Sequence, residues 1–190
     1  MNDPYVMPNG VLRNKLGITD QQLLATAEAD ITRARLIQLT ERPLPGKYDL
    51  DHLRAFHAAI FGDLYSWAGE LRTVDIAKRT PFCPVIHLDS YAKEVFGRLA
   101  SSDGLRGHSR DQFVRLLAQL YGDLNALHPF REGNGRTQRA FLEQFSAAAG
   151  YRLSWAGMIP QENEEGSIKS FLGDNSLPEH MLDRLVASPC

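Results

Sequence analysis

The sequence predicts an all-α protein with one small β-hairpin. Apolar residues recur every three or four positions along most of the 190 residues, which is the spacing of helices that bury one face. Two of these stretches open with a capping-box pattern, a Ser or Thr followed three residues later by Gln. Glycine and proline separate the stretches and end them. Residues 64–84 break the helical pattern, and there we expect the hairpin.

The composition fits a single domain that spans residues 1–190. Hydrophobic residues make up 43% of the chain, enough for a core of its own. The 21 basic and 23 acidic residues leave a net charge of −2, which argues against direct binding to nucleic acid or to an anionic membrane. No apolar run is long enough to cross a bilayer, and Cys83 and Cys190 lack the spacing of a disulfide or metal site. We therefore expect a cytoplasmic protein.

The N-terminal part is predicted to be scaffold. Residues 1–18 contain two prolines and two glycines and should form an extended arm laid over the body. A helix follows, from a capping box of Thr19 and Gln22 to about Glu41. The expected anchors of the arm are Tyr5, Val6, Val11 and Leu12. The expected buried face of the helix is Leu24, Ala27, Ile31, Ala34 and Gln38.

The next helix carries two histidines. Asp49 can cap this helix, and Gly62 should end it. His52 and His57 are five positions apart, so they do not share the helix face that joint metal ligation would need. We expect both to be structural or exposed.

Residues 64–84 are expected to fold into a hairpin. Thr73–Ile76 alternates polar and apolar residues like a short strand. The residues that lead the chain back are Thr80, Pro81 and Phe82. An isolated two-stranded hairpin is only marginally stable, so composition alone leaves a plain surface loop as an equal alternative.

Helices are predicted for most of the remaining chain. Asp89 can cap one of them. Another runs over Ser109–Leu127 from a capping box until Pro129 forbids its continuation, and a third covers about residues 135–149. The core side of the first is Val95, Phe96 and Leu99.

The C-terminal part is expected to begin irregularly after Gly150 and to end in a helix. The acidic run at residues 161–167 should form a solvated loop or helix face. Ser176 and Pro178 open the last amphipathic helix.

The twelve residues from His128 to Arg139, HPFREGNGRTQR, hold most of the recognisable chemistry. Gly133 and Gly135 allow a tight turn that points free backbone amides over the N-terminus of the following helix. Three arginines surround this helix end: Arg131, Arg136 and Arg139. Because cations oppose the helix dipole there, the arrangement is best explained by an anionic ligand such as a di- or triphosphate.

Three other residues of this segment complete a candidate site. His128 has an unperturbed pKa of about 6.5 and could take a proton from a hydroxyl without large tuning. Glu132 is the one carboxylate, and it suits Mg²⁺, which binds one or two carboxylates plus substrate phosphates. Phe130 should point inward and fix the loop to the core. A Gly-Asn-Gly link alone is more often a simple turn, but the conjunction with a base, a carboxylate and arginines favours a ligand site.

HPFREGNGRTQR matches the motif H-x-F-x-[DE]-G-N-G-R-x-x-R at every position, and the chain therefore resembles the Fic family. The stretches FGDLYSWAGELRTVDI, TPF and DPYVMPNGVLRNKLGI also resemble that family, so the likeness spans most of the chain. It implies a Fic-type helical bundle in which the hairpin at residues 64–84 is a flap beside the active site. It also implies an enzyme that transfers AMP from ATP, with Mg²⁺, to a Ser, Thr or Tyr hydroxyl of a target protein.

The resemblance implies a role for each motif residue. His128 would be the general base, and Glu132 would be the Mg²⁺ ligand. Residues that would hold the phosphates are Gly133, Asn134 and Gly135 as a cradle, Arg136 at the β-phosphate and Arg139 at the γ-phosphate. Residues of the flap that would pair with an extended target segment by strand addition are Thr80, Pro81 and Phe82.

Two other functions stay open. The related Doc branch binds ATP in the reverse orientation and transfers the γ-phosphate as a protein kinase, although its motif resembles this one less around Gly135 and Arg136. A catalytically silent, nucleotide-dependent interaction module is the other alternative. It is disfavoured because His128 and Glu132 are both present.

The resemblance also suggests partners. Small Fic proteins of one domain resemble bacterial toxins, some of which modify type II DNA topoisomerases. Because no further domain is attached here, we expect a toxin rather than a translocated effector. Fic enzymes are commonly restrained by a helix bearing [ST]-x-x-x-E-[GN], whose Glu pairs with the second motif arginine, here Arg139. The sequence contains no such pattern, so we expect a separate small helical antitoxin.

Overall fold

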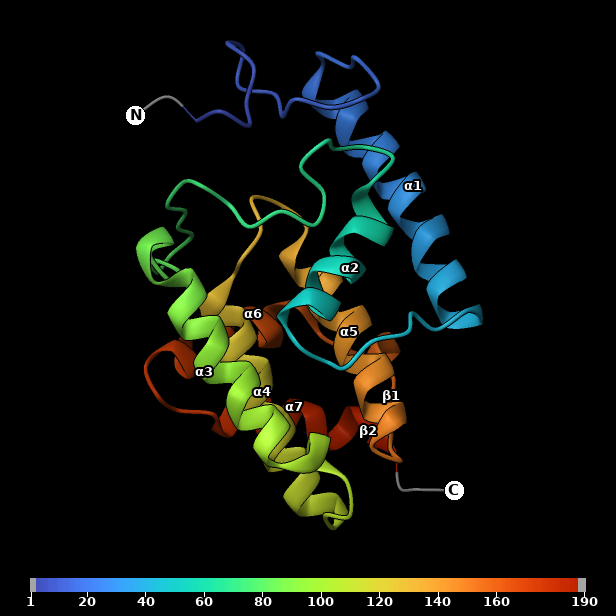
Figure 1. The fold of residues 1–190 in the computed structure, drawn as a ribbon, viewed down its shortest axis with the longest axis vertical. Coiled ribbons are helices and arrows are strands. Elements are labelled where there is room, and N and C mark those ends of the chain that lie inside the picture. The colour runs from blue at the N-terminus through green and yellow to red at the C-terminus, as the bar shows by residue number, and fades with distance from the viewer. Residues whose placement is uncertain (1–2, 188–190) are drawn as a thin grey trace.

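The computed structural model describes residues 3–187, and this part of the chain confirms the all-α prediction (Figure 1). The helices are α1 (Gln21–Glu41), α2 (Leu50–Phe61), α3 (Leu88–Ser101), α4 (Arg110–Leu127), α5 (Asn134–Ala148), α6 (Pro160–Phe171) and α7 (Ser176–Leu185). Short 3-10 helices are η1 (Val85–His87), η2 (Asp103–Leu105) and η3 (Trp155–Gly157). Two short strands, β1 (Arg152–Leu153) and β2 (Val186–Ala187), pair antiparallel.

The main core surrounds α4 and α5. Helix α2 packs on α5, whereas α3 and α7 pack on α4, as the ribbon shows (Figure 1). The largest fully buried side chains of α4 and α5 are Phe113, Leu117, Leu127, Phe141 and Phe145. Burying aromatic and aliphatic side chains of this size is the main favourable contribution to folding. The loop between α4 and α5 is therefore held between two well-anchored helices.

Helix α4 begins as predicted, but two other helix caps differ from expectation. The capping box of Ser109 and Gln112 is present. Helix α1 is capped by Asp20, whose carboxylate accepts a hydrogen bond from the Leu23 N–H at 2.8 Å, and not by Thr19. Asp89 lies within the first turn of α3 instead of capping it, because η1 leads directly into that helix.

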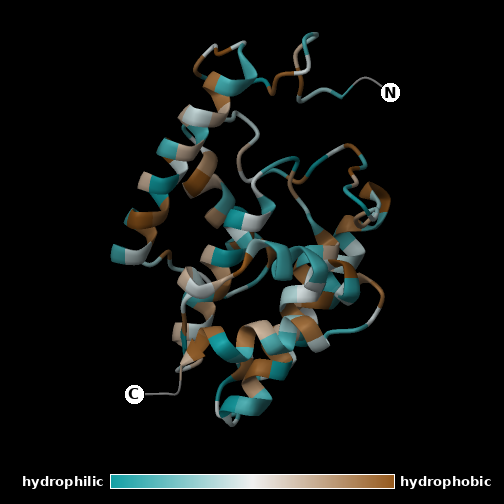
Figure 2. Ribbon diagram, turned by 180° about the vertical axis from the view of Figure 1, so that it is seen from behind, coloured by the Kyte–Doolittle hydropathy of each residue, from teal (hydrophilic) through white to brown (hydrophobic). Residues whose placement is uncertain are grey.

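The predicted buried face of α1 is wrong at several positions. Leu24 and Thr32 are its buried residues, whereas Ala34 and Gln38 are exposed. Hydrophilic residues are distributed along the whole of α1 (Figure 2). A polar side of the helix faces the molecule because it contacts Arg136 of α5, which no pattern within α1 indicates.

The N-terminal arm is anchored largely as predicted. Tyr5 and Val11 are buried, and Val6 forms a β-bridge with Leu12. Tyr5 packs edge-on against Trp67, with 5.3 Å between ring centroids. The arm therefore belongs to a second, smaller hydrophobic cluster, which also contains Ile60, Phe61, Leu64 and Tyr65.

The predicted strand at Thr73–Ile76 does not form. The segment between α2 and η1 closes through an isolated bridge between Ala77 and Pro81. The carbonyls of Val74 and Cys83, which a longer ladder could have used, accept hydrogen bonds from the buried Arg72 guanidinium. The hairpin is thus reduced to a short turn because a side chain takes the backbone groups at its base.

The C-terminal part agrees with expectation. The stretch after Gly150 contains β1 and η3, and residues 161–167 lie within α6, so the acidic run is helical. Cys83 forms no disulfide within residues 3–187, and Cys190 lies outside the described residues. In that same range, no helix combines the length and apolar character needed to cross a membrane.

Candidate active site

The loop between α4 and α5 begins and ends with left-handed residues. His128 caps the C-terminus of α4 with φ 42° and donates its N–H to the Leu124 carbonyl at 3.1 Å. Gly133 precedes α5 with φ 80°. A Cβ at Gly133 would also come within 2.2 Å of the Phe61 ring, so glycine is required here by both conformation and space.

Two side chains of this loop hold it in shape. Asn134 accepts a hydrogen bond from the Phe130 N–H at 2.9 Å and donates one to the Phe130 carbonyl at 2.7 Å. Phe130 is buried, as predicted, and stacks on His57 with 3.9 Å between ring centroids. The Asn134 side chain therefore shapes the loop, and only its backbone amide is free to face a ligand.

The N-terminus of α5 offers unpaired amides. The first N–H of α5 that is bonded back along the chain is that of Thr137, which donates to the Gly133 carbonyl at 3.0 Å. The amides of Asn134, Gly135 and Arg136 have no hydrogen-bond partner within residues 3–187. Such a helix end, with its dipole, is a ready site for an anion.

His57 braces the loop from α2. Its Nε2–H donates to the Glu132 carbonyl at 3.0 Å, and its Nδ1 accepts from the Gly69 N–H at 2.8 Å. These partners fix the tautomer, because a carbonyl can only accept and an amide N–H can only donate. Burial lowers the pKa of His57 to about 4. The expectation of a structural histidine is confirmed, but its contact with the loop had no signal in the sequence.

Arg72 is a second brace that sequence reasoning missed. Its side chain is fully buried, and its Nε–H donates to the His128 carbonyl at 2.9 Å. Its other donors reach the Val74 and Cys83 carbonyls, and its backbone N–H donates to the Pro129 carbonyl at 2.8 Å. The nearest carboxylate, that of Asp75, lies 3.8 Å away. One guanidinium thus joins the start of the loop to the base of the flap, residues 64–84.

His128 presents one nitrogen without a partner. Its Nδ1–H donates to the Asn125 carbonyl at 3.2 Å, so Nε2 carries the lone pair and has no partner within residues 3–187. Phe82 of the flap stacks on the imidazole, with 3.6 Å between ring centroids. Burial, with smaller contributions from the charges of Lys78 and Arg72, lowers the pKa of His128 to about 3. The expected value near neutrality is therefore wrong, because the ring is packed between the flap and α4.

The three arginines of the segment differ in their surroundings. Arg131 pairs with Asp3 of the arm at 2.8 Å, and Arg136 pairs with Glu28 of α1 at 2.5 Å. Arg139 has no carboxylate within 4 Å among the described residues, and burial lowers its pKa. Beside Arg139 lies a cavity of about 360 Å³, whose apolar lining includes Leu36, Leu39, Phe56, Ala140 and Trp155.

Comparisons with known proteins agree with this geometry. The sequence profile described as the Fic/DOC family matches residues 47–146. The chain belongs to the Fic/DOC family. The Fic/DOC match contains both the motif at residues 128–139 and the flap, but it leaves out the arm and α1.

Three similar proteins span most of the chain. Protein adenylyltransferase VbhT of Bartonella schoenbuchensis is 41% identical over 96% of the chain, which covers 39% of that protein. Probable protein adenylyltransferase Fic of Escherichia coli K12 is 35% identical over 97% of the chain and 92% of that protein. The N-terminal Fic domain of a VirB-translocated Bep effector from Bartonella quintana, with bound ADP, has a TM-score of 0.93 at 27% identity and covers 97% of the chain and 95% of that domain. The helical fold is therefore that of a Fic domain.

Glu132 has one oxygen that suits a metal ion in a Fic-type site. Its Oε1 accepts from the Gly133 N–H at 2.8 Å and lies 3.6 Å from Arg136 Nη2. Its Oε2 has no partner within residues 3–187, and the side chain is 44% exposed. No cluster of three or more His, Cys, Asp or Glu side chains suited to a metal occurs in that range. A single free carboxylate oxygen fits Mg²⁺ that takes its remaining ligands from phosphates and water.

Proposed function

We propose that this Fic domain transfers AMP from ATP to a Ser, Thr or Tyr hydroxyl of a target protein. The observation that carries the proposal is His128, whose Nε2 has no partner within residues 3–187, in the loop that leads to a helix end with two arginines and three amides that are likewise unpaired in that range. The names of the two curated relatives and the ADP of the Bartonella quintana domain support it. Because ATP is the substrate, we place the reaction in the cytoplasm.

The proposed reaction uses His128 as the general base. Its neutral imidazole accepts the proton of the acceptor hydroxyl at Nε2 while the hydroxyl oxygen bonds to the α-phosphorus. The bond between the α-phosphorus and its bridging oxygen to the β-phosphate breaks, and pyrophosphate leaves. Because the pKa of His128 is lowered to about 3, the ring is neutral at pH 7 but weakly basic, so proton transfer accompanies attack.

Charge on the departing pyrophosphate would be met at the N-terminus of α5. The donors available there are the amides of Asn134, Gly135 and Arg136, which have no partner among residues 3–187, and the guanidiniums of Arg136 and Arg139. Donors that are already in place stabilise developing charge without reorganising during the reaction. We propose that Arg136 acts near the β-phosphate and Arg139 at the γ-phosphate.

We propose that Glu132 holds Mg²⁺ through Oε2. The ion, when bound, neutralises phosphate charge. Glu132→Gln keeps the size of the side chain and its contact with the Gly133 amide but loses the charge. We expect the variant to need more Mg²⁺ for half-maximal transfer and to turn over more slowly. Superimposable Mg²⁺ titrations of variant and parent would contradict the assignment.

We propose that the flap docks the target as an added strand. Thr80 is partly exposed and Pro81 is exposed, and they adjoin Phe82, which touches His128. An extended segment paired with these residues would bring its hydroxyl to Nε2 through main-chain contacts. Target sequence would then matter little at the acceptor position.

We also propose a small helical antitoxin whose Glu pairs with Arg139. Support comes from Arg139, which lacks a carboxylate partner among residues 3–187, and from the cavity of about 360 Å³ beside it. A charge-assisted pair there would exclude the γ-phosphate. Co-expression with a small protein carrying [ST]-x-x-x-E-[GN] should suppress transfer, and its Glu→Gly variant should bind without suppressing. Inactivity of the purified chain with ATP and a competent acceptor would contradict this regulation.

Labelled ATP distinguishes the possible reactions. The chain is incubated with lysate and with ATP labelled at either the α- or the γ-phosphate, and His128→Ala serves as the control. Mass spectrometry then identifies the modified residue, with type II DNA topoisomerases tested as purified acceptors. Protein-bound α-label supports AMP transfer, whereas γ-label indicates a Doc-type kinase. Nucleotide binding without any transfer indicates a silent interaction module and contradicts the proposal.

A further inference from the structure

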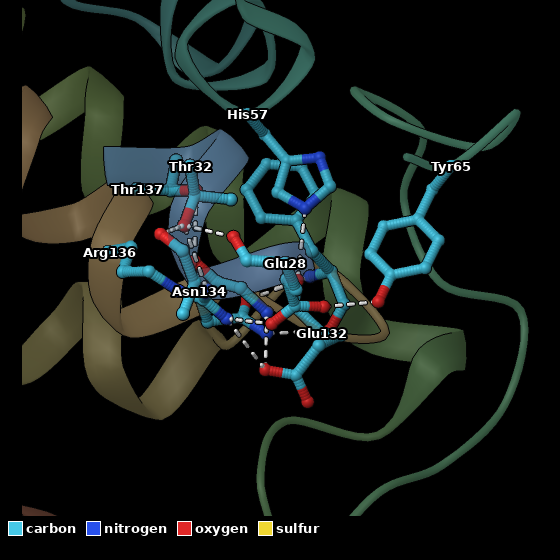
Figure 3. A network of polar contacts seen from close by, with 11 residues as sticks. Glu28, Thr32, His57, Tyr65, Glu132, Asn134, Arg136 and Thr137 are labelled. Atoms are coloured by element: carbon cyan, nitrogen blue, oxygen red, sulfur yellow. Dashed lines mark hydrogen bonds and ion pairs between the residues drawn. The ribbon is translucent and has the colours of Figure 1, made fainter. Parts of the chain in front are cut away.

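Helix α1 contributes a polar pair to the anion site, although it lies outside the Fic/DOC match. Arg136 Nη2 donates to Glu28 Oε1 at 2.5 Å, and Arg136 Nη1 donates to Thr32 Oγ1 at 3.2 Å (Figure 3). The Thr32 hydroxyl donates to the Glu28 carbonyl at 2.7 Å, which leaves its oxygen free to accept from Arg136. Both terminal nitrogens of the guanidinium are thus held by α1.

Tyr65 holds the second oxygen of the Glu28 carboxylate. Its hydroxyl donates to Glu28 Oε2 (Figure 3), and its buried ring stacks on Trp67 with 4.4 Å between centroids. Burial, and then Glu28, raise the pKa of Tyr65, so the hydroxyl keeps its proton and remains a donor. Each oxygen of Glu28 therefore has a partner, one from Arg136 and one from Tyr65.

Arg136 keeps donors for an anion despite these contacts. Guanidinium carries five N–H groups, and α1 takes two of them. Phe61 supports the guanidinium from below at 4.8 Å from its ring centroid. A phosphate can therefore bind the remaining N–H groups while Glu28 and Thr32 stay in place. That excess of donors argues that Glu28 orients the arginine and does not compete with the ligand for it.

We propose that Glu28, held by Tyr65, is a positioning residue that orients Arg136 for the phosphates of the nucleotide. The inference rests on the proposed function, in which ATP binds at the N-terminus of α5. An arginine side chain has large rotamer freedom, and fixing it before binding removes that ordering cost from the binding step. Helix α1 is in this view part of the nucleotide site.

Binding of ATP with Mg²⁺, measured by calorimetry, tests the proposal without requiring an acceptor. We expect Glu28→Gln to weaken binding about tenfold and Tyr65→Phe to weaken it less, because Tyr65 acts one contact further away. Asp30→Asn is the matched control: Asp30 is an exposed carboxylate of the same helix with no ion pair among residues 3–187. It should bind like the parent.

A double-variant cycle separates positioning from general support of the fold. If Glu28 acts through Arg136, Glu28→Gln should have no further effect on affinity in an Arg136→Gln background. In transfer assays, the single variant Glu28→Gln should raise the KM for ATP and leave the KM for the acceptor unchanged. A loss that adds in full to that of Arg136→Gln would overturn the proposal, and so would unchanged or tighter binding by Glu28→Gln.

Other variants keep the test open if Glu28→Gln does not fold, as judged by thermal unfolding. Thr32→Val and Tyr65→Phe each remove one hydroxyl, and the same cycle with Arg136→Gln applies to both. Additive losses for both would overturn the proposal. Failure of the parent chain to bind ATP at all would instead contradict the proposed function, so the two failures are distinguishable.

Discussion

His57 contacts the loop between α4 and α5, and His128 begins it; burial lowers the pKa of both, to about 4 and about 3. They differ in their hydrogen bonds. Both nitrogens of His57 have backbone partners, whereas His128 uses Nδ1 and leaves Nε2 without a partner among residues 3–187. A perturbed pKa alone therefore does not identify the base. The nitrogen without a partner among residues 3–187 is what makes His128, and not His57, the candidate base.

Removing the His128 ring should have the largest effect of any change to this pair. We expect His128→Ala to lower the rate of AMP transfer about 10²–10⁴-fold while ATP affinity stays near that of the parent, because the proposed phosphate contacts lie on α5. Transfer and ATP binding are measured on the same preparation. His128→Asn is the control for the backbone, since Asn tolerates the left-handed conformation. Near-normal transfer by either variant would contradict the assignment.

His57 should matter mainly for stability. His57→Phe keeps an aromatic ring beside Phe130 but leaves the Gly69 N–H and the Glu132 carbonyl without their partner. An unpaired buried group costs about 1–3 kcal/mol, so we expect a total loss of about 3 kcal/mol in the free energy of unfolding. Urea denaturation measures it. If His57→Phe folded stably but its transfer rate fell as far as that of His128→Ala, the assignment of a structural role to His57 would be wrong.

The pH dependence of stability should reveal both histidines. In the unfolded chain each takes up a proton near pH 6.5, whereas in the folded chain their pKa values are lowered to about 4 and about 3. The unfolded state therefore binds more protons below pH 6.5, and stability falls as pH falls. Where a histidine is fully protonated in the unfolded chain and neutral in the folded chain, it lowers the free energy of unfolding by about 1.4 kcal/mol for each unit by which the pH falls.

Unfolding free energies between pH 7 and pH 5.5 measure this slope above the range where most carboxylates titrate. We expect His57→Phe to have a shallower slope than the parent, by up to the contribution of one histidine. An identical slope in the two proteins would show that His57 is not the neutral, buried group described here.

What the sequence predicts well is local. The capping box at Ser109 and the glycines around Asn134 are short-range patterns, and they place the ends of α4 and α5 within a residue or two of the structure. The inward position of Phe130 follows from the same segment. The roles of the motif residues in transfer stay predictions that rest on the family resemblance.

What the sequence does not reveal is contact between distant segments. His57 reaches the Glu132 carbonyl across 75 positions, and Glu28 reaches Arg136 across 108. Neither pair has a spacing that a periodic pattern could detect. The same kind of contact explains two errors. Arg136 draws a polar side of α1 inward, and Arg72 takes the carbonyls that the predicted strand at Thr73–Ile76 would have used.

The buried Arg72 fixes one part of the flap, whereas the tip is free of its contacts and should tolerate more substitutions. Its guanidinium fixes the Val74 and Cys83 carbonyls to the His128 carbonyl, whereas the tip, residues 77–81, is mostly exposed and makes no bond to Arg72. If the flap docks the target as proposed, substitutions at the tip would change which proteins are accepted without displacing the His128 backbone. Under that proposal, the range of targets could diverge through exposed tip residues while Arg72 keeps the start of the loop in place, and Lys78 is the tip residue whose charge also acts on His128.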